Sequence, residues 1–216
     1  MNRIYLVRHG ENYANISKEF SYKSVDYDLT EKGRLQAEQT ALYFRQIQVN
    51  YLYSSPLKRA LQTAEYIAEV INRNIETVEY FRELNVGDLE KSKPDKKSWD
   101  IYFKVMDDWF NGKKNSTFPN GENYKTLLER FYAGLEYVTK EKDNENIVVV
   151  GHAGIFLAGI LELCSIKNKK EFVSRRNNNC SISEITLKKK KNKLTAELIR
   201  WADDSHLSGE AAEFIN

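Results

Sequence analysis

The chain has 216 residues, of which 41% are hydrophobic, and this suits one globular domain with its own core rather than two large domains. Its 33 lysines and arginines nearly balance 31 aspartates and glutamates, which argues against general attraction to nucleic acid or to an anionic membrane. Two cysteines, Cys164 and Cys180, do not make a disulfide framework, and no apolar stretch has signal-peptide or membrane length. We therefore expect a cytoplasmic protein with reduced thiols and a local anion site.

An apolar run near the start of the chain leads into a charged pair. Residues 4–7 predict a buried strand, and Arg8 and His9 follow at its carboxyl end. Thr30 is a suitable N-cap for a helix that extends to about residue 47, because small and aromatic residues repeat there at helical spacing. These segments predict a strand, a loop and a helix.

A second strand and helix follow. The strand is expected over residues 51–54, after which Ser55 and Pro56 are interpreted as the N-cap and first residue of a helix. Arg59 lies in the first turn, off the apolar stripe, where the helix dipole slightly disfavours a cation. The position of Arg59 therefore indicates function rather than stability.

The second half of the chain contains a less regular segment and the most apolar strand. A third strand is expected over residues 76–80, and residues 90–123 then become lysine-rich and aromatic with proline and glycine breakers. A helix over residues 124–139 leads to the apolar strand at residues 147–150, which His152 follows. We interpret the irregular segment as a cap insertion.

The alternation of strands and helices predicts an α/β fold. We expect a three-layer sandwich with a mainly parallel central sheet, an antiparallel edge strand and a helical cap insertion. A final hairpin supplies the antiparallel edge, and the lysine run at residues 188–193 is interpreted as its solvated tip rather than a polyanion site. One domain is expected over residues 1–216, with the insertion at roughly 85–123.

Reactive side chains follow separate strands of this sheet. Since the carboxyl ends of parallel strands meet at one edge, residues near those ends can converge. The candidates are Arg8, His9, Arg59, Glu83 and His152. Arginines bind phosphate, imidazoles donate to it or attack it, and a carboxyl group can carry a proton, so the set predicts phosphoryl transfer.

A metal site is the alternative use of two histidines and a glutamate. The adjacent arginines would repel a cation, and no pair of ligands is spaced along a helix, so we expect no metal and no cofactor. The third histidine, His206, follows two aspartates and is expected to have a structural or surface role.

With these residues the chain resembles the histidine phosphatase superfamily, which includes cofactor-dependent phosphoglycerate mutases and many small phosphatases. The matching stretches extend over most of the chain and occur in the family's order, which makes the resemblance specific. They are Leu6-Val7-Arg8-His9-Gly10-Glu11 with Asn15, residues 29–33 with Gln36-Ala37, residues 54–64, Arg82-Glu83-Leu84, Gly121-Glu122 and residues 151–154.

The resemblance implies a role for each site residue. His9 would attack phosphorus in line and become a phosphohistidine, with Glu83 as the acid for the leaving group and then the base for water. The implied contacts to the substrate are Arg8, Asn15, Arg59, His152 and the amide of Ala153. The N-terminus of the helix after Pro56 would add an oriented dipole.

Three functions stay open on this basis. A phosphatase acting on a small phosphorylated metabolite is favoured over a phosphoglycerate mutase-type isomerase, because residues 83–90 differ from the resembling mutases and the cap has no arginine pair. A non-catalytic phosphate-binding module is the third, and it would tolerate loss of His9 or Glu83, which are both present. The cap lysines that could contact a second anionic group are Lys91, Lys93, Lys96 and Lys97.

Overall fold

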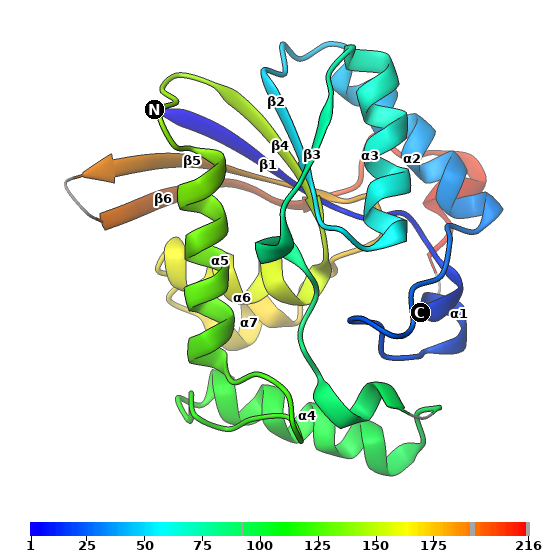
Figure 1. Cartoon of the computed structure of the whole chain (residues 1–216), viewed down its shortest axis with the longest axis vertical. Helices are drawn as coiled ribbons and strands as arrows, with labels where there is room; N and C mark the ends of the chain where they lie inside the picture. Colours follow the sequence, from blue (N-terminus) through cyan, green and yellow to red (C-terminus); the bar gives the residue numbers. More distant parts are fainter. Residues whose placement is uncertain (92, 191–192, 215–216) are drawn as a thin grey trace.

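The chain forms one six-stranded sheet with helices on both faces (Figure 1). The computed structural model describes residues 1–91, 93–190 and 193–214. The strands are β1 (Asn2–Arg8), β2 (Tyr51–Ser54), β3 (Ile75–Thr77), β4 (Asn146–Gly151), β5 (Ile182–Lys190) and β6 (Lys193–Asp203). The α-helices are α1 (Tyr13–Ser17), α2 (Glu31–Phe44), α3 (Lys58–Ile71), α4 (Lys96–Phe110), α5 (Tyr124–Val138), α6 (Ala153–Leu163) and α7 (Lys169–Val173), and 3₁₀ helices cover Glu79–Phe81, Gly87–Lys91 and Gly209–Ala212.

The sheet has the strand order β3-β2-β4-β1-β5-β6. The first four strands are parallel, and β5 and β6 add an antiparallel pair at one edge. This arrangement confirms the predicted α/β fold with a mainly parallel sheet. Residues 191–192, at the expected hairpin tip, lie outside the described residues.

Apolar side chains fill both faces of the sheet. Because side chains alternate along a strand, Tyr5 and Val7 of β1 pack with α2 and α3, whereas Ile4 and Leu6 pack with α5 and α6. The four central residues of β4 are fully buried, as expected for a strand covered on both sides. The sheet and its two helical layers therefore share two hydrophobic cores. Within the described ranges, no helix combines the length and apolarity needed to cross a bilayer.

Helix α3 begins later than the sequence predicts. Its N-cap residue is Leu57, whereas Ser55 and Pro56 were expected to start the helix. The Ser55 hydroxyl lies 2.7 Å from His152 Nε2 and 3.4 Å from the Leu57 N–H that it accepts. The Ser55 side chain, which was expected to cap α3, therefore contacts His152 in the loop after β4.

The start of α2 agrees with the sequence prediction, whereas the end of β3 does not. Thr30 caps α2 as predicted, since its hydroxyl accepts the Gly33 N–H at 3.0 Å. Strand β3 is shorter than the predicted residues 76–80, because Glu79–Phe81 turns into a 3₁₀ helix.

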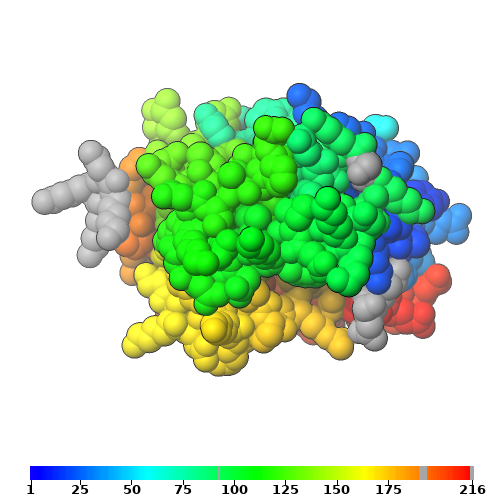
Figure 2. All heavy atoms as spheres, turned by 90° about the horizontal axis from the view of Figure 1, so that it is seen from below, coloured from blue at the N-terminus to red at the C-terminus, as the bar shows by residue number. Residues whose placement is uncertain are grey.

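The segment of residues 85–123, called the cap below, lies at the end of the molecule toward which the parallel strands run. Helix α4 crosses this end beneath α5 in Figure 1, and cap residues cover much of the face seen in Figure 2. The Phe20 ring lies 4.6 Å from Trp99 and 5.4 Å from Tyr102 between centroids, which joins the cap to the loop after α1.

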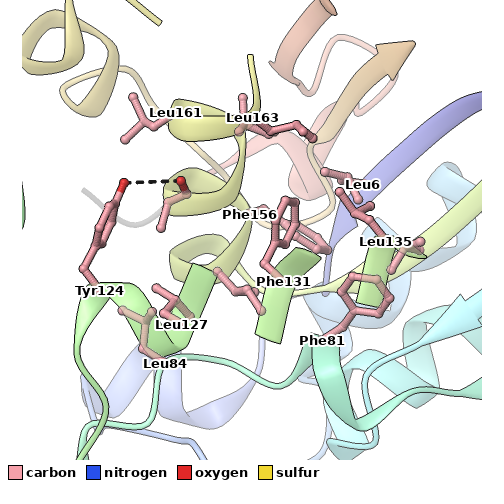
Figure 3. Packing of buried hydrophobic residues seen from close by; sticks show 14 of the residues in the cluster. Leu6, Phe81, Leu84, Tyr124, Leu127, Phe131, Leu135, Phe156, Leu161 and Leu163 are labelled. Atoms are coloured by element: carbon pink, nitrogen blue, oxygen red, sulfur yellow. Dashed lines mark hydrogen bonds between the residues drawn. The ribbon is translucent and has the colours of Figure 1, made fainter. Parts of the chain in front are cut away.

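Helices α5 and α6 approach closely at Gly159. A Cβ at that position would lie 2.4 Å from the ring of Phe131, which packs beside Phe156 in Figure 3. The Tyr124 hydroxyl donates to Ala158 O at 3.4 Å, shown as a dashed line in Figure 3. Glycine is needed here because the ring occupies the space of a methyl group.

We predict that Gly159→Ala lowers the free energy of unfolding by about 1–3 kcal/mol, the usual cost of overpacking a core. Urea unfolding followed by circular dichroism measures this change. In Phe131→Leu the smaller side chain leaves room for the methyl group, so the double variant should lose less stability than the sum of the two single losses. Strict additivity would contradict the proposed clash.

Candidate active site

His9 lies just beyond β1, beside the end of β4. Its backbone N–H donates to Gly151 O at 2.9 Å, which continues the pairing of the two strands. The residue is 3% exposed, and its Nδ1 is 2.7 Å from Gly10 O. A carbonyl oxygen only accepts hydrogen bonds, so the proton is assigned to Nδ1 and the lone pair to Nε2.

The surroundings of His9 favour its neutral form. Burial is the main cause that lowers the pKa of the ring well below its usual value, and the guanidinium groups of Arg59 and Arg8 lower it further. The hydrogen bond to Gly10 O acts in the opposite direction. The ring therefore keeps a nucleophilic lone pair at neutral pH.

Arg59 contacts that lone pair directly. Its Nε donates to His9 Nε2 at 3.0 Å, and its two terminal nitrogens donate to Ser21 Oγ and Ser21 O, each at 2.8 Å. Arg59 is 2% exposed, and burial lowers its pKa to about 10, so it is cationic at neutral pH. Attack by His9 Nε2 requires Arg59 Nε–H to donate to another acceptor instead, and a phosphoryl oxygen can be that acceptor.

Glu90 holds the loop that contacts Arg59, a role that no sequence motif indicates. Its Oε1 accepts four consecutive backbone N–H groups, those of residues 22–25, at 2.6, 2.7, 3.0 and 3.1 Å. Successive N–H groups that point to one spot form an anion-binding nest. Because Ser21 immediately precedes the nest, the Glu90 carboxylate links the cap to the guanidinium of Arg59.

Arg8 and Asn15 add further polar groups near His9. Arg8 Nη1 donates to Asn177 O, and the buried Arg8 Nε has no partner among the described residues. Asn179 Nδ2 donates to both His9 O and Asn15 Oδ1 at 3.1 Å. The unpartnered Nε of Arg8 is therefore suited to bind an anion.

Glu83 is attached to the first turn of α6. Its Oε1 accepts the N–H groups of Leu84 and Ile155 at 2.9 and 3.1 Å, and Oε2 accepts that of Gly154 at 3.1 Å. The first N–H groups of a helix lack partners within the helix, and here they orient the carboxylate. Oε2 has one such partner and retains a lone pair.

The backbone around Glu83 is held by Arg130 of α5. The guanidinium donates to Tyr80 O, Arg82 O and Glu83 O at 2.8, 2.7 and 3.1 Å. It also forms a 2.9 Å ion pair with Glu122, the residue of the Gly-Glu match noted in the sequence. Arg130 itself carries no recognisable motif, so the sequence analysis missed it.

His152 is fully buried next to His9, with 5.2 Å between ring centroids. Burial is the main cause that lowers its pKa well below the usual value, followed by the charge of Arg59. Its Nε2 faces the Ser55 hydroxyl, and its Nδ1 has no partner in the described part of the chain. The remote His206 lies 3.0 Å from Thr40 Oγ1 through Nε2, a structural contact.

One cavity of about 220 Å³ brings most of the predicted site together. The predicted site residues in its wall are Arg8, His9, Asn15, Arg59 and Glu83. His152 and Ala153 do not line it. A larger hollow of about 760 Å³ lies around Met1 and Leu194, near the opposite end of β1, and contains none of the predicted site residues.

Two expected contributions to the anion site are not placed at the cavity. The four cap lysines do not line the cavity, and Lys91 and Lys96 instead form ion pairs with Asp88 and Asp100 at 2.6 and 3.0 Å. The N-terminus of α3 is occupied by the Asp26 carboxylate, which accepts the Lys58 N–H at 2.9 and 3.2 Å. Across residues 1–91, 93–190 and 193–214, no cluster of three or more His, Cys, Asp or Glu side chains is placed to hold a metal ion.

Comparison with known proteins identifies the family. The model of the histidine phosphatase superfamily (branch 1) matches residues 4–199. The chain is 30% identical to a probable phosphoglycerate mutase GpmB of Erwinia tasmaniensis over 219 residues, which cover 99% of this chain and 98% of that protein. The chain therefore belongs to the histidine phosphatase superfamily, as the sequence resemblance indicates, and this places it among phosphatase-type and mutase-type enzymes.

Solved structures share the fold at lower identity. Bacillus stearothermophilus YhfR has a TM-score of 0.80 and 22% identity, covering 95% of this chain and 99% of that chain. Phosphoserine phosphatase of Entamoeba histolytica, solved with phosphoserine, has a TM-score of 0.76 and 22% identity, covering 96% and 100%. Mycobacterial glucosyl-3-phosphoglycerate phosphatase has a TM-score of 0.76 and 21% identity, covering 94% and 99%. These similarities confirm the fold.

We predict that Glu90→Ala weakens the binding of inorganic phosphate roughly tenfold. Without Glu90 the loop that carries Ser21 is no longer fixed, and Arg59, which donates to Ser21, loses its preorganised position. Titration calorimetry measures the affinity. Glu90→Gln keeps an oxygen acceptor and should retain more of it, whereas Glu69→Ala, an exposed change on α3, should behave as wild type. Equal losses in both Glu90 variants would contradict a role for the acceptor oxygen.

The buried histidines predict a loss of stability toward acid. The pKa of His206 is lowered to about 4 by burial, and those of His9 and His152 also lie below the usual 6.5. As pH falls below 6.5, the unfolded chain takes up protons that the folded chain does not, so the free energy of unfolding decreases. Each histidine contributes up to about 1.4 kcal/mol per pH unit.

Urea unfolding between pH 7.5 and about pH 5, above most carboxylate titrations, measures this slope. His206→Gln removes one of the three groups, so its stability should fall less steeply with acid than that of the wild type. A flat profile in the wild type would contradict the neutral assignment of the buried rings.

Proposed function

We propose that the protein is a phosphatase that hydrolyses a small phosphorylated metabolite through a phosphohistidine on His9. The neutral His9 ring carries the proposal, because its Nδ1 proton is bound to Gly10 O and its Nε2 lone pair lies against the Arg59 guanidinium in the cavity wall. A lone pair on a ring nitrogen suits nucleophilic attack on phosphorus, and the neighbouring guanidinium can stabilise the negative charge of the phosphoryl group.

In the first step, Nε2 attacks phosphorus and the bond to the leaving oxygen breaks. Arg8 and Arg59 stabilise the negative charge on the transferring group. The hydrogen bond donated by Arg59 Nε changes its acceptor from His9 Nε2 to a phosphoryl oxygen, and the proton stays on Arg59. Glu83, protonated before the step, gives its proton to the departing alcohol. The products are a phosphohistidine, an alcohol and an ionised Glu83.

In the second step, water attacks the phosphohistidine and Glu83 takes its proton. The P–N bond breaks, phosphate leaves and His9 returns to its neutral form. The free lone pair of Glu83 Oε2 supports this role as the base. Asn15, His152 and the Ala153 amide are proposed as additional phosphate contacts, and for His152 and Ala153 this requires a shift, since neither lines the cavity.

A mutase is the second candidate. Relatives at 30% identity carry the name probable phosphoglycerate mutase, and in a mutase the phosphohistidine would transfer its group to another hydroxyl of the metabolite. Structural neighbours are named as phosphatases for phosphoserine and glucosyl-3-phosphoglycerate. The sequence after Glu83, which differs from the resembling mutases, supports hydrolysis.

We predict that the wild type releases phosphate from members of a panel of phosphorylated metabolites, and that His9→Ala reduces this release roughly a thousandfold or more because the nucleophile is lost. Malachite green detection measures phosphate, and a ³²P label transferred from substrate to protein that is lost in acid but kept in base identifies a phosphohistidine. His206→Gln, which changes a histidine outside the cavity, is the matched control and should retain activity.

The same proteins are tested for conversion of 3-phosphoglycerate to its isomer, with and without bisphosphoglycerate. Isomer formation without phosphate release would establish the mutase and overturn the proposal. Absence of both reactions in well-folded wild type that still binds inorganic phosphate would establish a binding module instead.

A further inference from the structure

The cations in the cavity wall all lie at the His9 end. They are Arg8 and Arg59, and a phosphate dianion at His9 would pair with both. The other ionisable side chains of the wall are Glu19, which is acidic, and Glu83, which is the proton donor of the proposed first step, so neither offers a positive charge. Among the described lining residues, no cation is left for a second anionic group.

The exposed cap lysines do not change this balance. None of them lines the cavity, and two are paired with acidic neighbours on the cap itself. A carboxylate or second phosphate on the leaving group would therefore lose solvation without gaining an opposite charge, in a cavity whose wall also contains Glu19.

The wall away from His9 is largely apolar and aromatic. Phe20, Trp99 and Tyr102 form one aromatic group, with Leu84 and Val86 beside it in the lining. Tyr102 is further supported from behind by the stacked ring of Phe118, 5.6 Å away between centroids. Such a surface binds apolar, flat or cationic groups.

We infer that the substrate carries one anionic group, its phosphate, and that its alcohol portion is uncharged or cationic and packs against the wall formed by Phe20, Trp99 and Tyr102. This inference rests on the proposed hydrolysis at His9. It makes Glu19 and the aromatic wall the determinants of specificity, and it disfavours phosphoglycerates, whose carboxylate would be unpaired in the cavity.

A neighbouring hollow provides the competing arrangement. It has a volume of about 210 Å³, shares Arg8 and Asn15 with the cavity, and contains Lys18. Glu11 lines the same hollow but is paired with Lys32 at 2.8 Å. Lys18 is the cation of this hollow that the cavity does not share, so it is the competing partner for a second anionic group.

Three phosphomonoesters of similar size and different charge test the inference: propyl phosphate, 2-aminoethyl phosphate and phosphoglycolate. We expect kcat/KM for the neutral and cationic esters to exceed that for the anionic ester by roughly tenfold or more. Glu19→Lys should raise the relative kcat/KM for phosphoglycolate, whereas Glu38→Lys, an exposed change on α2 of equal net charge, should leave the order unchanged.

Trp99→Ala tests the wall separately. Its KM for benzyl phosphate should rise by roughly tenfold, while its affinity for inorganic phosphate stays within about twofold of the wild type. Equal weakening of both ligands would show a general structural effect and overturn the specificity role of the wall.

Preference for phosphoglycolate in the wild type would overturn the inference, and loss of that preference in Lys18→Gln would assign the second anionic group to the neighbouring hollow. If neither the esters nor any metabolite of the panel is hydrolysed, the proposed function fails, and the charge inference is then decided by calorimetric affinities of the same three esters for wild type and for His9→Ala. The same order of affinities would support it, and tightest binding of phosphoglycolate would overturn it.

Discussion

The position of one proton determines what the other groups around His9 can do. Because Gly10 O binds the Nδ1 proton, the lone pair of the ring lies on Nε2, and Arg59 donates to that atom. Burial and the nearby guanidinium groups oppose a second proton on the ring. The carboxyl ends of β1 and β4, joined by the hydrogen bond from His9 to Gly151, place this ring beside His152 and the first turn of α6. The sheet thus supplies the positions, and two short hydrogen bonds select the reactive form of the histidine.

Those parts of the structure that depend on local sequence are predictable from it. The strands around residues 4–7, 51–54 and 147–150 and the Thr30 cap agree with the observed elements, since apolar runs and capping side chains act over a few residues. The parallel sheet also explains why Arg8, His9, Arg59 and Glu83 could be grouped before their distances were known.

The remaining features depend on contacts between distant segments, and local patterns carry no information about them. Ser55 has the sequence of a helix cap but bonds to His152, so α3 starts two positions later than Pro56 at Lys58. Glu90 binds backbone N–H groups, which every residue except proline carries, so they leave no motif in the loop that it holds. Charge alone does not show that Lys91 and Lys96 form ion pairs with neighbours on the cap rather than lining the cavity.

The nest around Glu90 also affects how the cavity wall and the loop that contacts Arg59 can change in evolution. The cap contributes Trp99 and Tyr102 to the cavity wall, and one oxygen of its Glu90 binds only backbone groups of the loop that contacts Arg59. The side chains of residues 22–25 therefore take no part in the hydrogen bonds to Glu90, which require only that the backbone path is kept. We therefore expect substitutions on α4 that keep the packing of Phe20 to change the cavity wall more than the contact between His9 and Arg59. A fold of this kind can diversify its substrates by drift in one segment while its phosphoryl chemistry stays constant.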